Sequence, residues 1–288
     1  MKINLHMIDY CNFKCRYCFA HFEKHETLSE EDWRKIIKNC ADSGLIDEIN
    51  FAGGEPLLSL DLTRLAAYAK SQGLKTGVIT NGLLLNRAWA GNFGKHFDTI
   101  GVSLDSFNPN TMRKIGRRWN EHDLDIDNLE DVLKFIKSTY PGMKIKLNTV
   151  VNRYNKNENL AKNIISRGLP IGRWKLLECK PFDDGVHSNN RLCVSDGDYA
   201  KFAAKQLEAF NLEYSPDISR YIADSGLEII AEKEMRAGYI MADSGGYLVD
   251  NARNSSYERV ADLRSIDFKA AFEKLTFDRS LYEARYEK

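Results

Sequence analysis

Three cysteines lie within eight residues near the start of the chain, as Cys11-x-x-x-Cys15-x-x-Cys18. Thiolates bind iron–sulfur clusters, and an electron-carrying cluster usually takes four of them. Three in one loop can bind three irons of a [4Fe–4S] cluster and leave the fourth iron open. The spacing therefore predicts a cluster whose open iron binds a small molecule.

Zinc is the alternative metal for this loop. Structural zinc needs a fourth Cys or His at characteristic spacing, usually as two pairs. His21 and His25 are near, but no second pair follows. A zinc-stabilised binding protein is therefore a competing hypothesis, which colour tests, since an iron–sulfur protein is brown and a zinc protein colourless. Cys179 and Cys193 have no partner motif, and we expect both to be buried apolar residues.

A second motif, Gly53-Gly54-Glu55-Pro56, follows a predicted strand. Its glycines allow a ligand to approach the backbone, and Glu55 offers a carboxylate to a cationic amine. Alone this is a weak signal. However, both motifs fall at the carboxyl ends of strands, where barrel enzymes place their active sites.

Strand-like and helix-like segments alternate as far as about residue 212, which predicts an α/β fold with a parallel sheet curled into a partial barrel. Residues 29–43 are a predicted helix that starts at Ser29. Residues 213–288 form a mixed C-terminal extension, with a loop at 243–246 and a helix near 267–274, and we expect it to close over the substrate site. The predicted strands are Lys2–Ile8, Glu48–Phe51, Thr76–Ile79, Thr99–Val102, Lys144–Val150 and Arg173–Leu177.

Polar and apolar residues alternate along four of these strands, as in Lys2, Asn4 and His6 against the intervening Ile3 and Leu5. A parallel strand covered on both faces should be apolar on both. The polar face therefore predicts a wet cavity inside the barrel. The alternative is that these are edge-like strands with one solvated face.

Three cations fall on these polar faces. Arg173 and Lys175 are two residues apart and share one face of a strand, and Lys146 lies on the strand before it. Cations in a barrel interior are costly unless an anion neutralises them, and a triphosphate is such an anion. The alternative is ion pairing with Glu48 or Glu178.

The overall charge limits the kind of ligand. The 288 residues carry 41 Lys plus Arg and 41 Asp plus Glu, a net charge of zero. This argues against a general nucleic-acid or anionic-membrane binder, while a small local cluster of cations is allowed. No apolar run is long enough to span a membrane and no signal layout opens the chain, so we expect a soluble, cytoplasmic protein.

The cysteine motif, the GGEP motif and Tyr17 before the last cysteine resemble the radical S-adenosylmethionine superfamily. Asn4-x-His6 precedes the cysteines as in the viperin family, and the resemblance is dense over residues 1–180. Further stretches similar to that family are 49–56, 80–82, 103–107, 115–117, 146–155 and 173–175.

This resemblance implies a partial (β/α)6 barrel that binds a [4Fe–4S] cluster and S-adenosylmethionine. Its implied reaction dehydrates a ribonucleoside triphosphate to the 3′-deoxy-3′,4′-didehydro form, a polymerase chain terminator used in antiviral defence. CTP is the first expectation, then UTP or GTP. The family also implies an external electron donor of the flavodoxin or ferredoxin type, and we expect a monomer that binds neither nucleic acid nor membrane.

The resemblance also assigns roles to residues. Asn4 faces the sugar, and Tyr239 borders the nucleotide and passes a proton or electron. A surface position for Arg117 and a core position for Tyr239 are the alternatives. The implied cluster ligands are Cys11, Cys15 and Cys18. The implied cofactor contacts are Tyr17, Gly54 and Glu55, the last two at the amino group, and Asn81, Ser103 and Arg117 at the carboxylate and ribose. The implied phosphate contacts are Lys146, Arg173, Lys175 and Arg285.

Two positions depart from the family pattern. Glu48 stands where a lysine is expected beside the nucleotide, and Ala52 where a serine is expected. The resemblance therefore does not determine which nucleobase the substrate carries. A radical enzyme acting on a peptide or small metabolite is the alternative enzyme. Peptide-modifying relatives commonly carry a cysteine-rich C-terminal cluster domain, and the absence of cysteine from residues 194–288 argues against it.

Overall fold

The computed structural model describes residues 1–18, 27–182, 188–233, 236–252 and 257–286, with residues 285 and 286 described by their backbone only. Within these ranges the frame is an 11-stranded sheet. From β11 to β10 every neighbouring pair of strands is parallel, and the outer pairs are antiparallel. In spatial order the strands are β13 (Glu258–Asp262), β12 (Tyr247–Asp250), β11 (Ile240–Ala242), β1 (Lys2–His6), β2 (Glu48–Ala52), β3 (Lys75–Thr80), β4 (Thr99–Ser103), β7 (Lys144–Val151), β8 (Arg173–Glu178), β10 (Glu228–Glu232) and β9 (Arg220–Ile222).

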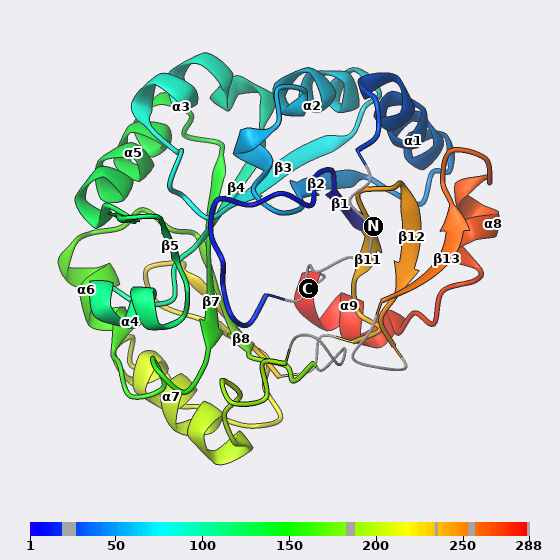
Figure 1. The fold of residues 1–288 in the computed structure, drawn as a ribbon. Coiled ribbons are helices and arrows are strands. Elements are labelled where there is room, and N and C mark those ends of the chain that lie inside the picture. Colours follow the sequence, from blue (N-terminus) through cyan, green and yellow to red (C-terminus); the bar gives the residue numbers. More distant parts are fainter. Residues whose placement is uncertain (19–26, 183–187, 234–235, 253–256, 287–288) are drawn as a thin grey trace.

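Helices cover the outer side of this curved sheet (Figure 1). Most of them connect consecutive parallel strands, as right-handed crossovers require. The short strands β5 (Arg118–Trp119) and β6 (His122–Asp123) form a separate hairpin. The helices are α1 (Glu30–Asp42), α2 (Leu62–Ser71), α3 (Arg87–Phe93), α4 (Pro109–Lys114), α5 (Ile126–Thr139), α6 (Leu160–Ser166), α7 (Asp196–Glu208), α8 (Phe268–Phe272) and α9 (Arg279–Tyr286), with 3-10 turns η1 (Pro56–Leu58) and η2 (Gly94–His96).

The predicted fold is confirmed, and all six predicted strands are present with ends that agree to within two residues. The sequence did not indicate the roles of β10 and β11. These strands follow one another without a helix between them, yet β10 pairs with β8 and β11 pairs with β1, at opposite sides of the six-stranded core. One sheet therefore continues from the barrel segment into the C-terminal extension.

Polar and apolar side chains point to opposite faces of the strands, as their alternation predicted. On β1, Ile3 and Leu5 are fully buried in the hydrophobic core between sheet and helices. Asn4 and His6 point to the other face and line a cavity. The idea of edge-like strands with a solvated face is therefore wrong for this strand.

The predicted helix over residues 29–43 is present as α1, which covers the outer side of the sheet. The Ser29 side chain accepts a hydrogen bond from the backbone N–H of Asp32 and caps α1. Trp33, Ile36 and Ile37 recur at helical spacing and are buried against the sheet. Each such side chain contributes about 1.5–3 kcal/mol by leaving water. Among the described helices, none is long and apolar enough to cross a membrane.

Candidate active site

A cavity of about 550 Å³ lies inside the barrel. Its volume falls in the range of small-molecule sites. The cysteine loop borders it, and residues of the C-terminal extension, among them Tyr239 and Met241, also line it. The polar side chains that face it from the barrel strands are Lys2, Asn4, His6, Asn50, Thr80, Thr99, Ser103, Lys146, Asn148, Lys175 and Glu178.

The cysteine loop is held on one side by the GGEP turn. The N–H of Gly54 donates to the carbonyl of Ile8 at 2.6 Å, and the N–H of Glu55 donates to that of Tyr10 at 2.9 Å. A Cβ on Gly54 would lie 1.9 Å from the Tyr10 carbonyl oxygen, and one on Gly53 would lie 2.3 Å from that of Ile8. The glycines are therefore needed because the loop backbone packs directly against them.

A second turn holds the other side of the loop. The N–H of Lys14 donates to the carbonyl of Gly116, and that of Arg16 to the carbonyl of Ile115, at 3.1 and 3.0 Å. Gly116 has a φ of +83°, and a Cβ there would lie 2.1 Å from the Lys14 carbonyl oxygen. The loop that carries Cys15 is thus fixed between two glycine-containing turns.

The three thiols of this loop fit an iron–sulfur cluster. Cys11, Cys15 and Cys18 are half-buried, unbonded to one another, and all line the cavity. Burial raises the pKa of the Cys15 thiol to about 12, so a metal is needed to hold it as a thiolate near neutral pH. Within the described ranges, no group of three or more Cys, His, Asp or Glu side chains is arranged to hold a metal ion, so the cluster stays a prediction from the cysteine spacing and zinc stays its alternative. His21 and His25 lie outside those ranges.

Glu55 supports the loop rather than the cavity. Its carboxylate is fully buried and accepts hydrogen bonds from the hydroxyl of Thr80 and the backbone N–H of Asn81, at 2.6 and 2.7 Å. The amide of Asn81 in turn donates to the side-chain oxygen of Asn12 at 2.6 Å. In this structure the carboxylate bonds to protein groups and does not line the cavity, and its predicted contact with a cationic amine stays a prediction.

Arg117 lies in the cavity wall, so its assignment as a surface charge is wrong. Its side chain is 3% exposed and donates to the carbonyl of Ser103 at 2.6 Å and to the hydroxyl of Tyr17 at 3.2 Å. Its Nε lies 3.4 Å from the buried carboxylate of Asp105, to which Tyr17 also donates. Tyr17, Asn81, Ser103 and Arg117, predicted to bind the cofactor, are therefore brought together around the cysteine loop, with Gly54 also in the wall.

The polar residues inside the barrel form layers along its axis. His6, Asn4 and Lys2 follow one another from the carboxyl end of β1 to its start. Beside Asn4, in register on β2, Asn50 donates to it through the side-chain amide at 3.1 Å. The thiols thus lie at the carboxyl ends of the strands, amides in the middle, and a lysine at the start of β1.

The predicted cations differ in their partners. Arg173 pairs with Glu228 and does not line the cavity. Lys175 pairs with Glu232 at 3.2 Å. The expectation of cations without carboxylates between them is thereby corrected, and the partners come from β10 rather than from Glu48 or Glu178.

Lys146 lines the cavity and differs from Arg173 and Lys175 in its partners. Within the part of the chain that the structure describes, its ammonium has no hydrogen bond and no ion pair. Burial lowers its pKa well below the ordinary value, and the like charges of Lys2, Arg173 and Lys175 lower it further. Such an ammonium is suited to an incoming anion.

Tyr239 faces the cavity, so its alternative as a core residue is wrong. Its hydroxyl donates to the carboxylate of Glu232, with oxygens at 2.7 and 2.8 Å, and accepts from the ammonium of Lys175 at 2.9 Å. Tyr239 precedes β11 and Glu232 ends β10. The three side chains therefore connect the two sides of the sheet where the barrel is open.

Arg285 lies in α9, and its side chain is outside the described part of the structure. Helix α9 itself is attached to β1, because the hydroxyl of Tyr282 accepts from the backbone N–H of Lys2 at 2.7 Å. The helix is therefore close to the start of β1, where Lys2 faces the cavity.

Cys179 and Cys193 were expected to be separate buried residues, and this is partly wrong. Their sulfurs are 3.8 Å apart, Cys179 lines the cavity and Cys193 is half-buried. The loop after β8 brings the two residues together across 14 positions, and the sequence gives no local signal for this contact.

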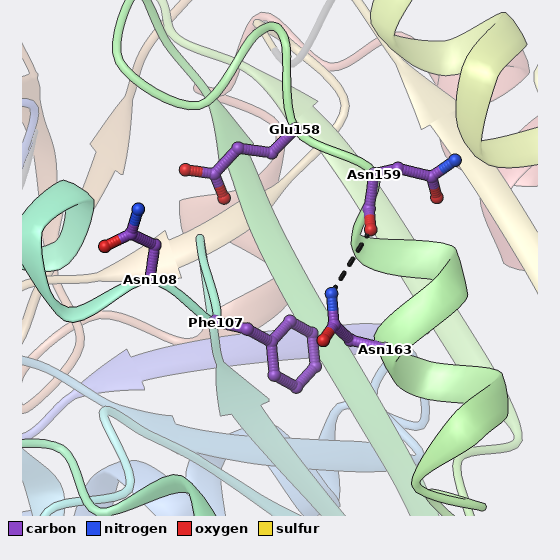
Figure 2. Close-up of a pocket in the computed structure, with 5 residues that line it drawn as sticks. All are labelled: Phe107, Asn108, Glu158, Asn159 and Asn163. Atoms are coloured by element: carbon purple, nitrogen blue, oxygen red, sulfur yellow. Dashed lines mark hydrogen bonds between the residues drawn. The ribbon is translucent and has the colours of Figure 1, made fainter.

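A second, shallower hollow of about 330 Å³ lies among the loops that precede α4 and α6 (Figure 2). It is lined by Phe107, Asn108, Glu158, Asn159 and Asn163. Glu158 accepts from the hydroxyl of Thr111 at 2.6 Å, and Asn163 donates to the carbonyl of Asn159 at 3.3 Å. The first bond joins the two segments and the second lies within the start of α6, and none of the predicted site residues lines the hollow.

Several cavity residues were not predicted as functional. Lys2 and Asn50 belong to the alternating strands, so the same polar-face pattern that gave Asn4 could have found them. Glu228 and Glu232 are four apart on β10, which puts them on one face. This strand was missed because it lies outside the alternation of strands and helices that predicted the others.

A parallel barrel with three thiols at one end of its cavity defines a class, the cofactor-binding α/β barrel enzymes. The fold is similar to that of anSMEcpe with bound AdoMet, with a TM-score of 0.69 and 16% identity over 98% of this chain and 83% of that one. The model of the Radical SAM superfamily matches residues 5–158.

Relatives give the narrower group. The S-adenosylmethionine-dependent nucleotide dehydratase of Selenomonas ruminantium is 38% identical over 99% of this chain and 98% of its own length. That of Fibrobacter sp. (strain UWH6) is 30% identical over 99% and 87%. The chain belongs to the radical S-adenosylmethionine superfamily and, within it, to the S-adenosylmethionine-dependent nucleotide dehydratase family.

Proposed function

We propose that this protein dehydrates a ribonucleoside triphosphate, CTP first and then UTP or GTP, to its 3′-deoxy-3′,4′-didehydro form. The relatives' shared name gives the reaction class. The observation that supports a triphosphate in this cavity is the half-buried ammonium of Lys146, which lines it beside two ion-paired lysines. The product's role as a chain terminator in antiviral defence is part of the same proposal.

The cofactor set is proposed from the cavity wall and the family. Cys11, Cys15 and Cys18 would bind a [4Fe–4S] cluster, and Tyr17, Gly54, Asn81, Ser103 and Arg117 would hold S-adenosylmethionine beside it. When bound, the cluster and S-adenosylmethionine would supply the radical chemistry that removes a hydrogen atom from the substrate. The enclosing barrel keeps the reacting groups close and excludes water.

The layers inside the barrel suggest how the nucleotide lies. Its ribose would meet Asn4 in the amide layer, on the side facing the thiols. Its phosphates would extend toward Lys2, Lys146 and Lys175. Helix α9, which carries Arg285, is attached near Lys2 and could deliver a further cation to the same end.

Tyr239 is proposed to act when the 3′-hydroxyl leaves. Leaving as water requires a proton, and completion of the product requires one more electron. The hydroxyl of Tyr239 lies between the carboxylate of Glu232 and the ammonium of Lys175, so a proton that it releases can be replaced from the ammonium, while the carboxylate orients the hydroxyl. This arrangement supports a role in proton transfer.

Lys146 should couple nucleotide binding to proton uptake. Its pKa is lowered in the free protein, and a bound triphosphate raises it again. Between these two pKa values, binding takes up a proton and weakens as pH rises, by at most about tenfold per pH unit. Calorimetric titrations in two buffers of different ionisation enthalpy measure this uptake.

Variants at Lys146 check the assignment. In Lys146→Met we expect the proton uptake to disappear and Kd for the nucleotide to rise about 10- to 100-fold, the value of a hydrogen bond to a charged group. Lys144→Met, on the exposed start of the same strand, is the matched control and should behave as the wild type. Unchanged proton uptake in Lys146→Met would contradict this role.

The proposed function is tested with the anaerobically reconstituted, reduced protein. It is incubated with S-adenosylmethionine and each of the four ribonucleoside triphosphates, and 5′-deoxyadenosine and nucleotide products are quantified. We expect one nucleotide to give both products in equal amounts. Absence of nucleotide-dependent 5′-deoxyadenosine with all four would refute the proposal.

A further inference from the structure

We propose that Cys179 and Cys193 are a modification site, a dithiol that a low-molecular-weight disulfide such as oxidised glutathione converts to an internal disulfide. The bond would fasten the segment between them, residues 180–192, of which the structure describes 180–182 and 188–192. This segment is called the cavity segment below, because residues 180–182 line the cavity. The inference goes beyond the proposed function and does not depend on it, since neither thiol is assigned to the cluster or the nucleotide.

The backbone holds the two cysteines beside each other. The N–H of Cys179 donates to the carbonyl of Val151 at 3.1 Å, and the carbonyl of Leu192, just before Cys193, accepts from the N–H of Arg153 at 2.9 Å. Val151 ends β7 and Arg153 follows it by two residues. Both ends of the cavity segment are therefore attached to one short stretch of backbone, which keeps the cysteines together.

The two sulfurs are within reach of a bond. They lie 3.8 Å apart, so a movement of roughly 2 Å brings them to disulfide distance. Cys193 is half-buried and can be reached by a small disulfide, whereas Cys179 is 3% exposed. The hydrogen bond with Cys179 lowers the pKa of the Cys193 thiol, which favours the thiolate, the form that attacks disulfides. Cys193 is therefore the attacking thiol and Cys179 the one that completes the bond.

Asn189 connects the cysteine pair to the residues that line the cavity. Its side chain is buried, donates to the carbonyl of Lys180 at 2.7 Å and accepts from the N–H of Phe182 at 2.8 Å. The Cys193 thiol donates to the backbone carbonyl of Asn189 at 3.7 Å. A thiol is a weak donor, so the sulfur contacts are the weak part of this arrangement. A covalent bond between the sulfurs would hold the cavity segment more firmly.

The oxidation is a two-step exchange. The Cys193 thiolate attacks one sulfur of the small disulfide, which forms a mixed disulfide and releases one small thiolate. The Cys179 thiolate then attacks the Cys193 sulfur, forms the internal bond and releases the second small thiolate. The two protein thiols lose two electrons and two protons, and the small disulfide gains both and becomes two thiols. The new bond closes the cavity segment into a loop and should restrict its opening.

The test uses the anaerobically reconstituted protein in buffers of reduced and oxidised glutathione. Free thiols are alkylated after an acid quench, and Arg191 places the two cysteines in different tryptic peptides for mass spectrometry. Cys193→Ser keeps a donor for the Asn189 carbonyl but cannot form the bond, and Cys193→Ala replaces it if it binds less iron. Cys40→Ala, at a buried cysteine of α1, is the matched control. Iron per chain is measured before and after oxidation.

In the wild type and in Cys40→Ala, we expect both thiols to be lost and a cross-link between the peptides of Cys179 and Cys193 to appear, with iron unchanged. Dithiothreitol should restore both thiols. In Cys193→Ser the cross-link should be absent. Amide deuterium exchange of the oxidised wild type should be slower than that of the reduced form by about tenfold or more in the cavity segment, and equal to it in α5.

Other outcomes overturn the inference. Two free thiols at every ratio of the glutathione forms would refute a dithiol site, and so would a glutathione adduct that stays on Cys193. A cross-link that forms only as iron is lost would assign the bond to the unfolding protein instead. Equal deuterium exchange in the two forms would refute closure of the cavity segment. None of these measurements uses a nucleotide, so failure of the proposed function leaves them intact.

Discussion

Replacing Gly54 with alanine is expected to abolish cluster binding. The new Cβ would lie 1.9 Å from the carbonyl oxygen of Tyr10 and 2.9 Å from the backbone nitrogen of Cys11. Both are backbone atoms that cannot move without displacing the cysteine loop. Iron and sulfide per chain after anaerobic reconstitution measure the effect, and we expect them to fall close to zero.

Gly91→Ala is the matched control for this substitution. Gly91 lies inside helix α3, and the nearest atom to a Cβ there is 3.8 Å away. Alanine should fit and stabilise the helix by about 0.5–1 kcal/mol. A Gly54→Ala protein that binds as much iron as Gly91→Ala would contradict the packing between the two motifs.

The second large effect concerns Lys2 and Glu48. Their Cα atoms are register partners on β1 and β2, and the Lys2 ammonium pairs with the Glu48 carboxylate at 2.7 Å. Lys2 is 7% exposed and lines the cavity. We expect Lys2→Met to raise Kd for the nucleotide about 100-fold, because it removes a phosphate contact and leaves a carboxylate to repel the phosphates.

Moving the cation should restore binding. In Lys2→Met combined with Glu48→Lys, the ammonium is carried by the neighbouring strand on the same face. We expect Kd to return to within about tenfold of the wild type. Glu48→Gln alone, which releases Lys2 from its partner, should tighten binding. If the double variant binds as weakly as Lys2→Met while its melting temperature equals the wild type's, Lys2 has no role in phosphate binding.

Sequence patterns predicted the core of the barrel because they are local. The alternation along β1 distinguishes Asn4 from its apolar neighbours, and the cysteine and GGEP motifs follow strands directly. The fold and the gathering of Tyr17, Asn81 and Arg117 around the cysteine loop therefore followed from short-range signals and the family resemblance.

The missed features all depend on contacts between distant segments. Strand β10 reaches β8 only after α7 and β9, so nothing near Arg173 or Lys175 indicates that Glu228 and Glu232 pair with them. The contact of Cys179 with Cys193 arises in the same way. Gly54, which lines the cavity, was interpreted as room for a ligand, and its packing against the loop of the other motif was not predicted.

Charge distribution links the site to the whole chain. A net charge of zero argues against a broad surface that binds polyanions. The barrel nevertheless keeps the half-buried Lys146, which has no ion pair among the described residues, beside two paired lysines. This feature is a local excess within a balanced composition.

Removal of the hydrogen atom at C4′ is tested most directly with a nucleoside triphosphate deuterated at that carbon. The nucleotide chosen is the one that the protein converts. It is incubated with the reduced protein and unlabelled S-adenosylmethionine, and the 5′-deoxyadenosine formed is examined by mass spectrometry. We expect one deuterium in the 5′-deoxyadenosine and none at C4′ of the nucleotide product. Unlabelled 5′-deoxyadenosine formed alongside a deuterium-retaining nucleotide would contradict it.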